Sequence, residues 1–143
     1  MNVQPIVDPR FEALNEASFL EKAAALMEED VVILDFPSGR EMKGADRFFQ
    51  YYNELLDIIP DLTSKIIDQE TYRNKVVSRL QLKGQFTGTF HTTQGTYSGN
   101  GNPIEIEYQI EQEFNAAGKV SRLVLNYNLS DFMYQLCRRY RPL

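Results

Sequence analysis

The sequence predicts an α+β fold in which a curved antiparallel sheet forms a cone-shaped half-barrel closed by N-terminal helices. Apolar residues recur at helical spacing up to residue 59, whereas strand-like alternation dominates the chain from residue 76 onward. Helices segregated from an antiparallel sheet in this way define an α+β domain. The 143 residues, 43% of them hydrophobic and 24% charged, fit a single globular domain. We expect it to span 1–143, with an arm at 1–8 and a tail at 138–143.

Helix is predicted over much of residues 9–28. Asp8 and Pro9 supply an N-cap and a proline at the first helical position, and Ser18 with Glu21 forms a capping box. The acidic residues 28–30 should end the helix, because negative charge is unfavourable at a helix C-terminus. A short strand at 31–36 and a turn at 37–39 follow.

A second helix is predicted over 45–59, ending before Pro60. Its apolar stripe consists of Phe48, Tyr52, Leu55, Leu56 and Ile59, and is widened by Phe49 and Tyr51. Such a stripe usually packs into the core. The functional alternative is that Phe49 or Tyr52 also covers a pocket.

Antiparallel strands should follow this helix. Alternation predicts strands at 62–68, 76–86 and 104–114, with a hairpin turn at 72–75 and a long loop at 92–103. In 104–114 one face is apolar and includes Tyr108, while the other carries four glutamates. Side chains two residues apart on a strand lie about 6.6 Å apart, so a solvated face is favoured over a metal site.

The last strand begins after Gly118 and leads into a helical turn over 130–137 that contains Met133. By alternation, Val124, Asn126 and Asn128 share one face of this strand, whereas Leu123, Leu125 and Tyr127 share the other. Two asparagines beside a valine indicate a partly polar cavity. The alternative is a strand end emerging into solvent, where asparagine is common.

Composition narrows the range of functions. A net charge of −5 and a pI near 4.9 disfavour nucleic acid as a partner. A single cysteine and a single histidine provide too few ligands for a His/Cys zinc site, and no metal or cofactor is expected. No apolar run reaches the length of a membrane span, and the N-terminus lacks signal-peptide features, so we expect a soluble cytoplasmic protein.

The order of elements and three sets of residues resemble the SnoaL-like family of the nuclear-transport-factor-2-like fold, over roughly 31–137. These sets are Asp35-Phe36-Pro37 with Gly44, Asp46 and Phe48-Phe49; Pro60-Asp61-Leu62 with Gly84-Gln85-Phe86-Thr87-Gly88; and Gly118-Lys119-Val120 with Gln135-Leu136. The resemblance implies a cone-shaped pocket for a small hydrophobic or mixed-polarity molecule, and a homodimer.

The sequence also departs from the family pattern. An aspartate base used by some members falls at Asn128, which cannot titrate, a frequent tryptophan falls at Val124, and a histidine falls at Phe86. The first hypothesis is therefore a binding protein that has lost the family-type base. The alternative is a cyclase or isomerase in which Asp35, if buried, or another acid acts as the base. Capping of the turn at 37–39 is the commoner role for an aspartate in this position. The expected pocket residues are Phe49, Tyr52, Phe86, Tyr108, Val124, Asn126, Asn128 and Met133.

Overall fold

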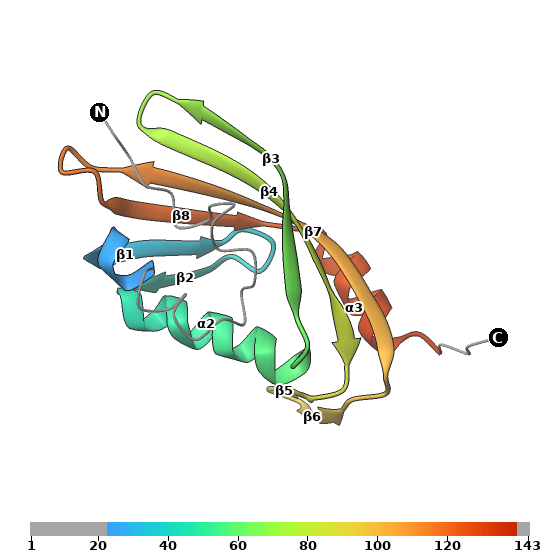
Figure 1. Ribbon diagram of the computed structural model, residues 1–143. Coiled ribbons are helices and arrows are strands. Elements are labelled where there is room, and N and C mark those ends of the chain that lie inside the picture. Colours follow the sequence, from blue (N-terminus) through green and yellow to red (C-terminus); the bar gives the residue numbers. More distant parts are fainter. Residues whose placement is uncertain (1–22, 140–143) are drawn as a thin grey trace.

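A six-stranded sheet in the order β2-β1-β8-β7-β4-β3 forms the body of the computed structural model, which describes residues 23–139 (Figure 1). Its strands are β1 (Met27–Asp35), β2 (Arg40–Lys43), β3 (Thr63–Tyr72), β4 (Lys75–Phe86), β7 (Asn102–Phe114) and β8 (Val120–Asn126). The remaining elements are the helices α2 (Ala45–Ile58) and α3 (Leu129–Cys137) and the two-stranded hairpin of β5 (Thr89–Thr92) and β6 (Gly95–Ser98). The predicted α+β class and most strand positions are confirmed.

The sheet is mixed, whereas the sequence predicted an antiparallel one. β1 runs parallel to β8, with Ile33 opposite Leu123 and Asp35 opposite Leu125. All the other pairs in the sheet are antiparallel. Alternation reveals which side of a strand is buried but not which strand lies beside it. The parallel neighbour of β1 therefore could not be inferred from its own residues.

The long strands β3, β4 and β7 bend strongly, and α2 lies along the concave side of the sheet (Figure 1). We call this concave side the inner face; it carries Leu80 of β4, Tyr108 of β7 and Leu123 of β8, all buried. The helix α2 contributes Phe48, Tyr51, Tyr52 and Ile58 to the same core. The prediction of a sheet curled around helix 45–59 is therefore confirmed.

The first predicted helix falls mostly outside the described residues. Residues 23–26 are helical, but β1 begins at Met27, earlier than the predicted strand at 31–36. Met27 pairs with Val120, and an irregularity before Val32 takes up the acidic segment 28–30. The short strand β2 was not predicted, because only Met42 among its four residues is buried.

The segment 92–103 is not a long loop. Residues 89–98 form the β5–β6 hairpin, and β7 begins at Asn102. Two glycines allow the hairpin to bend away from the main sheet. A Cβ at Gly88 would lie 1.7 Å from the carbonyl oxygen of Asp57, and one at Gly99 would lie 2.5 Å from the carbonyl carbon of Thr87. In the sequence, nothing other than the glycines themselves indicates these close backbone contacts.

The helix α3 covers part of β7 that has no strand on one side, because β8 pairs only with residues 109–114. The Gln135 side chain accepts a hydrogen bond from the Glu105 backbone N–H at 2.7 Å and donates one to the Glu105 carbonyl oxygen at 2.8 Å. Its amide thus takes the place of a neighbouring strand along this edge.

No helix within residues 23–139 is long and apolar enough to cross a membrane. Over the same residues, no three His, Cys, Asp or Glu side chains gather closely enough to hold a metal ion.

Candidate functional site

A polar cluster lies on the inner face where β1 and β8 end. Asp35 is the last residue of β1, and Tyr127 directly follows β8. The parallel pairing brings these two strand ends to the same edge of the sheet. Tyr51 reaches the site from α2 and Tyr108 from β7, and we call these four residues the Asp35 cluster.

Asp35 is a buried carboxylate with only 4% of its surface exposed. Its Oδ2 accepts a hydrogen bond from the Tyr127 hydroxyl at 3.0 Å. Its Oδ1 lies 3.4 Å from the backbone nitrogen of Ser38, a long contact that caps the turn after β1. Asp35 therefore does cap this turn, and its second oxygen also faces a phenol.

Three tyrosine rings converge beside this carboxylate. The Tyr108 and Tyr127 rings stack with centroids 4.4 Å apart, and the Tyr51 and Tyr108 hydroxyls lie 3.0 Å apart, within hydrogen-bond distance. Tyr127 also meets Phe132 of α3 edge-to-face at 6.3 Å. Aromatic packing thus fixes the rings that carry the polar atoms.

All three phenols are held in their protonated form. Burial, followed by the proximity of Asp35, raises the pKa of Tyr127 to about 12. Burial also raises the pKa of Tyr51 and of Tyr108 well above the ordinary tyrosine range, each reinforced by a neighbouring phenol. At neutral pH the Tyr127 hydroxyl is therefore the donor and Asp35 the acceptor. One of the paired Tyr51 and Tyr108 hydroxyls donates to the other, and the accepting hydroxyl keeps a proton with which to bind another oxygen atom.

The structure separates the residues that the sequence assigned to one pocket. Asp35 and Tyr108 lie together in the cluster. Tyr52 is buried and Phe49 half-buried on α2, and burial raises the pKa of Tyr52 to about 12. Phe86 and Met133 line a different cavity, described below.

The expectation that Val124, Asn126 and Asn128 point into the cavity is wrong. Both asparagines are exposed and Val124 is half-buried, whereas Leu123 and Leu125 are buried on the inner face. The Asn128 side chain instead accepts a hydrogen bond from the Asp131 backbone N–H at 2.9 Å and thereby caps α3. The alternative interpretation, a strand end that emerges into solvent, is the one that the structure supports.

Sequence reasoning missed Tyr51 and Tyr127. Tyr127 has the same parity on its strand as Leu123 and Leu125, so alternation already placed it on the apolar side. An aromatic hydroxyl that continues a buried apolar face is the signal that could have identified it. Tyr51 was counted only as part of the apolar stripe.

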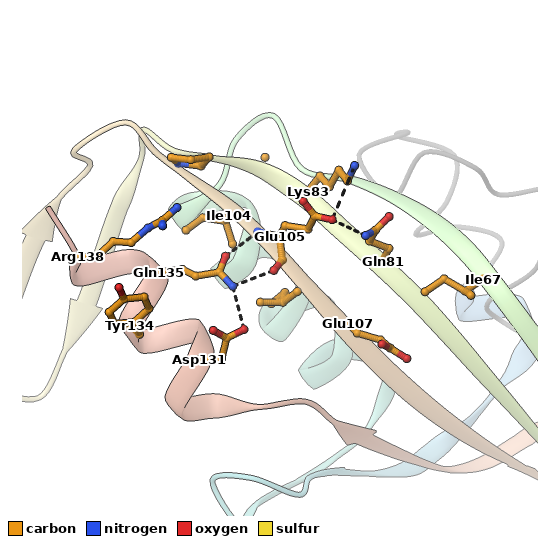
Figure 2. Close-up of a pocket in the computed structure, with 13 residues that line it drawn as sticks. Ile67, Gln81, Lys83, Ile104, Glu105, Glu107, Asp131, Tyr134, Gln135 and Arg138 are labelled. Atoms are coloured by element: carbon orange, nitrogen blue, oxygen red, sulfur yellow. Dashed lines mark hydrogen bonds and ion pairs between the residues drawn. The ribbon is translucent and has the colours of Figure 1, made fainter. Parts of the chain in front are cut away.

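We describe three cavities among residues 23–139, and these three include no member of the Asp35 cluster. The largest, about 700 Å³, is a groove between α3 and the convex side of β4 and β7 (Figure 2). Here Gln135 bonds to Glu105 and also donates to Asp131 at 2.9 Å. Most of its charged groups are exposed, and two of them, Lys83 and Glu105, form an ion pair at 3.9 Å. The groove holds no buried reactive group.

The other two cavities differ in charge. One of about 370 Å³ contains Arg40, Glu54, Asp57 and His91, and Arg40 forms an ion pair with Glu54 at 3.1 Å. The other, of about 500 Å³, lies between the β5–β6 hairpin and α3 and is lined by uncharged side chains, including Phe86 and Met133. We call it the hairpin cavity.

The mixed curved sheet with α2 on its concave side matches the nuclear-transport-factor-2 and ketosteroid-isomerase-like class of fold among solved structures. The family model of the SnoaL-like polyketide cyclases matches residues 6–136. The chain therefore belongs to the SnoaL-like polyketide cyclase family. No curated protein sequence matches it significantly.

Several solved structures share the fold at low sequence identity. A candidate SnoaL-like polyketide cyclase from Jannaschia sp. CCS1 is 14% identical with a TM-score of 0.76, over 87% of this chain and 83% of that one. A candidate polyketide cyclase from Xanthomonas campestris is 20% identical with a TM-score of 0.69, over 92% and 93%. A ketosteroid-isomerase-like protein from Catenulispora acidiphila, solved with trimethylamine, is 14% identical with a TM-score of 0.70, over 99% and 100%.

Proposed function

We propose that this protein is an acid–base enzyme of the cyclase or isomerase type, acting on a small, largely apolar carbonyl compound, with Asp35 as its base. The observation that carries the proposal is the 3.0 Å contact between Tyr127 and the buried Asp35, beside the paired Tyr51 and Tyr108 hydroxyls. Membership of the polyketide cyclase family supports the same class of chemistry.

The roles follow from the chemistry of the groups. The Asp35 carboxylate takes a proton from a carbon next to a carbonyl, and the electron pair of that C–H bond moves onto the carbonyl oxygen as an enolate. A phenol that keeps its proton at neutral pH can donate a hydrogen bond to that oxygen as its negative charge develops. One of the paired Tyr51 and Tyr108 hydroxyls fits this role, because burial keeps both protonated and only one of their two protons lies between them. The enolate then either recovers a proton at another position or attacks a second carbonyl within the same molecule.

Tyr127 has a positioning role. Its hydroxyl fixes Asp35 Oδ2, while its ring stacks on Tyr108, so it couples the base to the donor pair. The proposed base lies at the end of β1 rather than at position 128, where the family resemblance put the aspartate base of some members.

The test is exchange of carbon-bound hydrogen for deuterium in a panel of enolisable ketones, followed by nuclear magnetic resonance in D₂O. This readout detects proton abstraction without knowledge of the natural product. Asp35→Asn keeps the shape and an oxygen acceptor for Tyr127 but removes the base. We expect exchange with the wild-type protein and a loss of about 10²-fold or more in the variant. Asn126→Asp, which adds a carboxylate on the exposed side of β8, is the matched control and should leave exchange unchanged.

A second candidate function is binding without chemistry. It is favoured by the fact that both Asp35 oxygens already have protein contacts, from Tyr127 and from the Ser38 backbone. Ketones that bind the wild-type protein but show no exchange would support this function. Exchange that persists in Asp35→Asn would show that another group is the base.

A further inference from the structure

The hairpin cavity is walled mainly by aromatic and aliphatic side chains. Phe86 comes from the end of β4, Phe90 from β5 and Tyr97 from β6, while Met133, Leu136 and Cys137 come from α3. The remaining lining residues are Thr, Gln, Ser and Asn side chains of residues 92–100. The cavity therefore combines apolar wall residues with a set of uncharged hydrogen-bonding groups, which we call its rim.

The absence of charge distinguishes it from the other two cavities formed by described residues. The groove beside α3 contains Lys83, Glu105 and Arg138, and the smallest cavity contains Arg40 and Asp57. No Asp, Glu, Lys, Arg or His lines the hairpin cavity. A site of this kind accepts neutral molecules and disfavours charged ones, because a charge placed there would lose hydration without gaining a partner.

The walls of this cavity are fixed by specific contacts. Gly99 N–H donates to the Gly88 carbonyl at 2.7 Å, and Gly88 N–H donates to the Ile58 carbonyl at 3.1 Å, which ties the hairpin base to the end of α2. On the other side, the Asn100 amide donates to the Leu136 carbonyl at 2.8 Å, which ties the segment after β6 to α3. The hairpin is thus fixed to α2 at its base, and the segment that follows it is fixed to α3.

Aromatic surface remains uncovered at this site. Tyr97 is 53% exposed and Phe90 is only half-buried, although both face the cavity. Covering such surface with an apolar ligand is favourable at about 25 cal/mol per Å². A volume of about 500 Å³ lies within the range of small-molecule sites.

We propose that the hairpin cavity is a second ligand site, which binds an uncharged, planar molecule of about naphthalene size carrying a carbonyl or hydroxyl group. The ring packs between the aromatic residues of the hairpin and Met133, and its oxygen meets the Thr, Gln, Ser and Asn rim. The site shares no residue with the Asp35 cluster and does not depend on its chemistry.

The test uses prodan, a neutral naphthalene ketone whose fluorescence reports an apolar environment, and follows Cys137 at the same time. Cys137 lines the cavity, is exposed and is the single cysteine of the chain, so its reaction rate with a thiol reagent reports this site alone. We expect saturable prodan binding and protection of Cys137 with the same midpoint. The anionic naphthalene 8-anilinonaphthalene-1-sulfonate should bind about tenfold more weakly or not at all at this site.

Two variants locate the probe. Met133→Trp fills the cavity and should weaken prodan binding about tenfold or more. Tyr134→Trp adds the same ring at the neighbouring residue, which is 63% exposed and lines the groove beside α3 instead, so it should have no effect. Tyr97→Ala removes an exposed wall and should weaken binding without disturbing the fold. The proposal would be overturned if prodan showed no saturable binding or bound without protecting Cys137. It would also be overturned if Met133→Trp and Tyr97→Ala bound prodan with the same affinity as the wild-type protein. Asp35→Asn should leave prodan binding unchanged, so the two proposals fail separately.

Discussion

The Tyr127 hydroxyl donates a hydrogen bond to the buried Asp35 carboxylate across 3.0 Å, joining the ends of two parallel strands. This contact depends on the mixed sheet. In an antiparallel pair the last residue of one strand lies beside the first residue of the other, so Asp35 and Tyr127 would be separated by the length of the strands. The strand order therefore assembles the base and its partner from residues 92 positions apart.

We expect Tyr127→Phe to destabilise the fold by about 1–3 kcal/mol, because it leaves a buried carboxylate oxygen without its donor while retaining the ring. Guanidinium unfolding at neutral pH measures the change. Tyr134→Phe is the matched control, since the Tyr134 side chain is exposed, and it should lie within about 0.5 kcal/mol of the wild-type protein. Equal stability of both variants would show that the hydrogen bond contributes nothing.

Stability should also fall at strongly alkaline pH. The pKa of Tyr127 is about 12 in the folded protein, against about 10 for an ordinary tyrosine. The folded state therefore binds the proton more tightly, and the resulting stabilisation is complete below about pH 10 and is lost as the pH rises toward about 12. Ultraviolet titration of tyrosinate, together with unfolding at each pH, measures both effects. Tyr127→Phe should show a smaller loss of stability over this interval.

Much of the fold follows from alternation and periodicity. The stripe of α2 and the strands β4 and β7 were predicted because in each a buried side alternates with a more exposed side over most of its length. β2 and the β5–β6 hairpin were missed because their residues are mostly exposed, which leaves no such pattern. These elements are held by backbone pairing rather than by apolar side chains.

The site was harder to predict than the fold. Asp35 was identified as a candidate base from its place after a strand, and Tyr108 from its apolar neighbours. The error at Asn126 and Asn128 arose because the wrong side of β8 was assigned to the cavity. Val124, Asn126 and Asn128 do share a side, but the buried side is the one that carries Leu123 and Leu125. The resemblance to the family added weight to the wrong face of β8.

Asn128 should therefore behave as a helix cap rather than as a pocket residue. Asn128→Ala is expected to cost about 1 kcal/mol, because the Asp131 N–H loses its acceptor, whereas Asn128→Asp should retain most of the stability. Thermal unfolding measures the loss. Asn126→Ala, on an exposed residue two positions earlier, should change stability by less than about 0.5 kcal/mol. A larger loss at position 126 than at 128 would contradict this assignment.

The convex side of the sheet is suited to a homodimer, which remains a prediction. Val77 and Val124 both lie opposite Glu111 in the strand register and are half-buried. Glutamates of β7 lie on this side and would disfavour association, but cations offset them, as with Lys75 and Glu111 at 3.6 Å. We expect sedimentation equilibrium to show a species of about twice 16.6 kDa.

The substitution Val124→Asp tests this face, because it places an unpaired charge within it. We expect it to weaken association about tenfold or more. Ala117→Asp, in the exposed turn between β7 and β8, adds the same charge away from the sheet and should leave the mass unchanged. A monomeric wild-type protein, or a dimer unaffected by Val124→Asp, would exclude this interface.

Asn102 should be critical for docking α3. Its amide is 2% exposed and points at three carbonyl oxygens near the C-terminus of the helix, those of Arg138 at 2.7 Å, Gln135 at 2.9 Å and Leu136 at 3.2 Å. The last carbonyls of a helix have no partner within the helix, so this one side chain supplies donors that the backbone cannot.

We expect Asn102→Ala to destabilise the fold by about 1–3 kcal/mol, because it leaves buried carbonyl oxygens without donors. Asn102→Asp should cost more at neutral pH, since a carboxylate would face those same oxygens with negative charge. Hydrogen exchange should show faster opening of α3 in both variants. Asn53→Ala on α2 removes an exposed amide and is the matched control. If Asn102→Asp proved as stable as the wild-type protein, the amide could not be what holds α3 against the edge of β7.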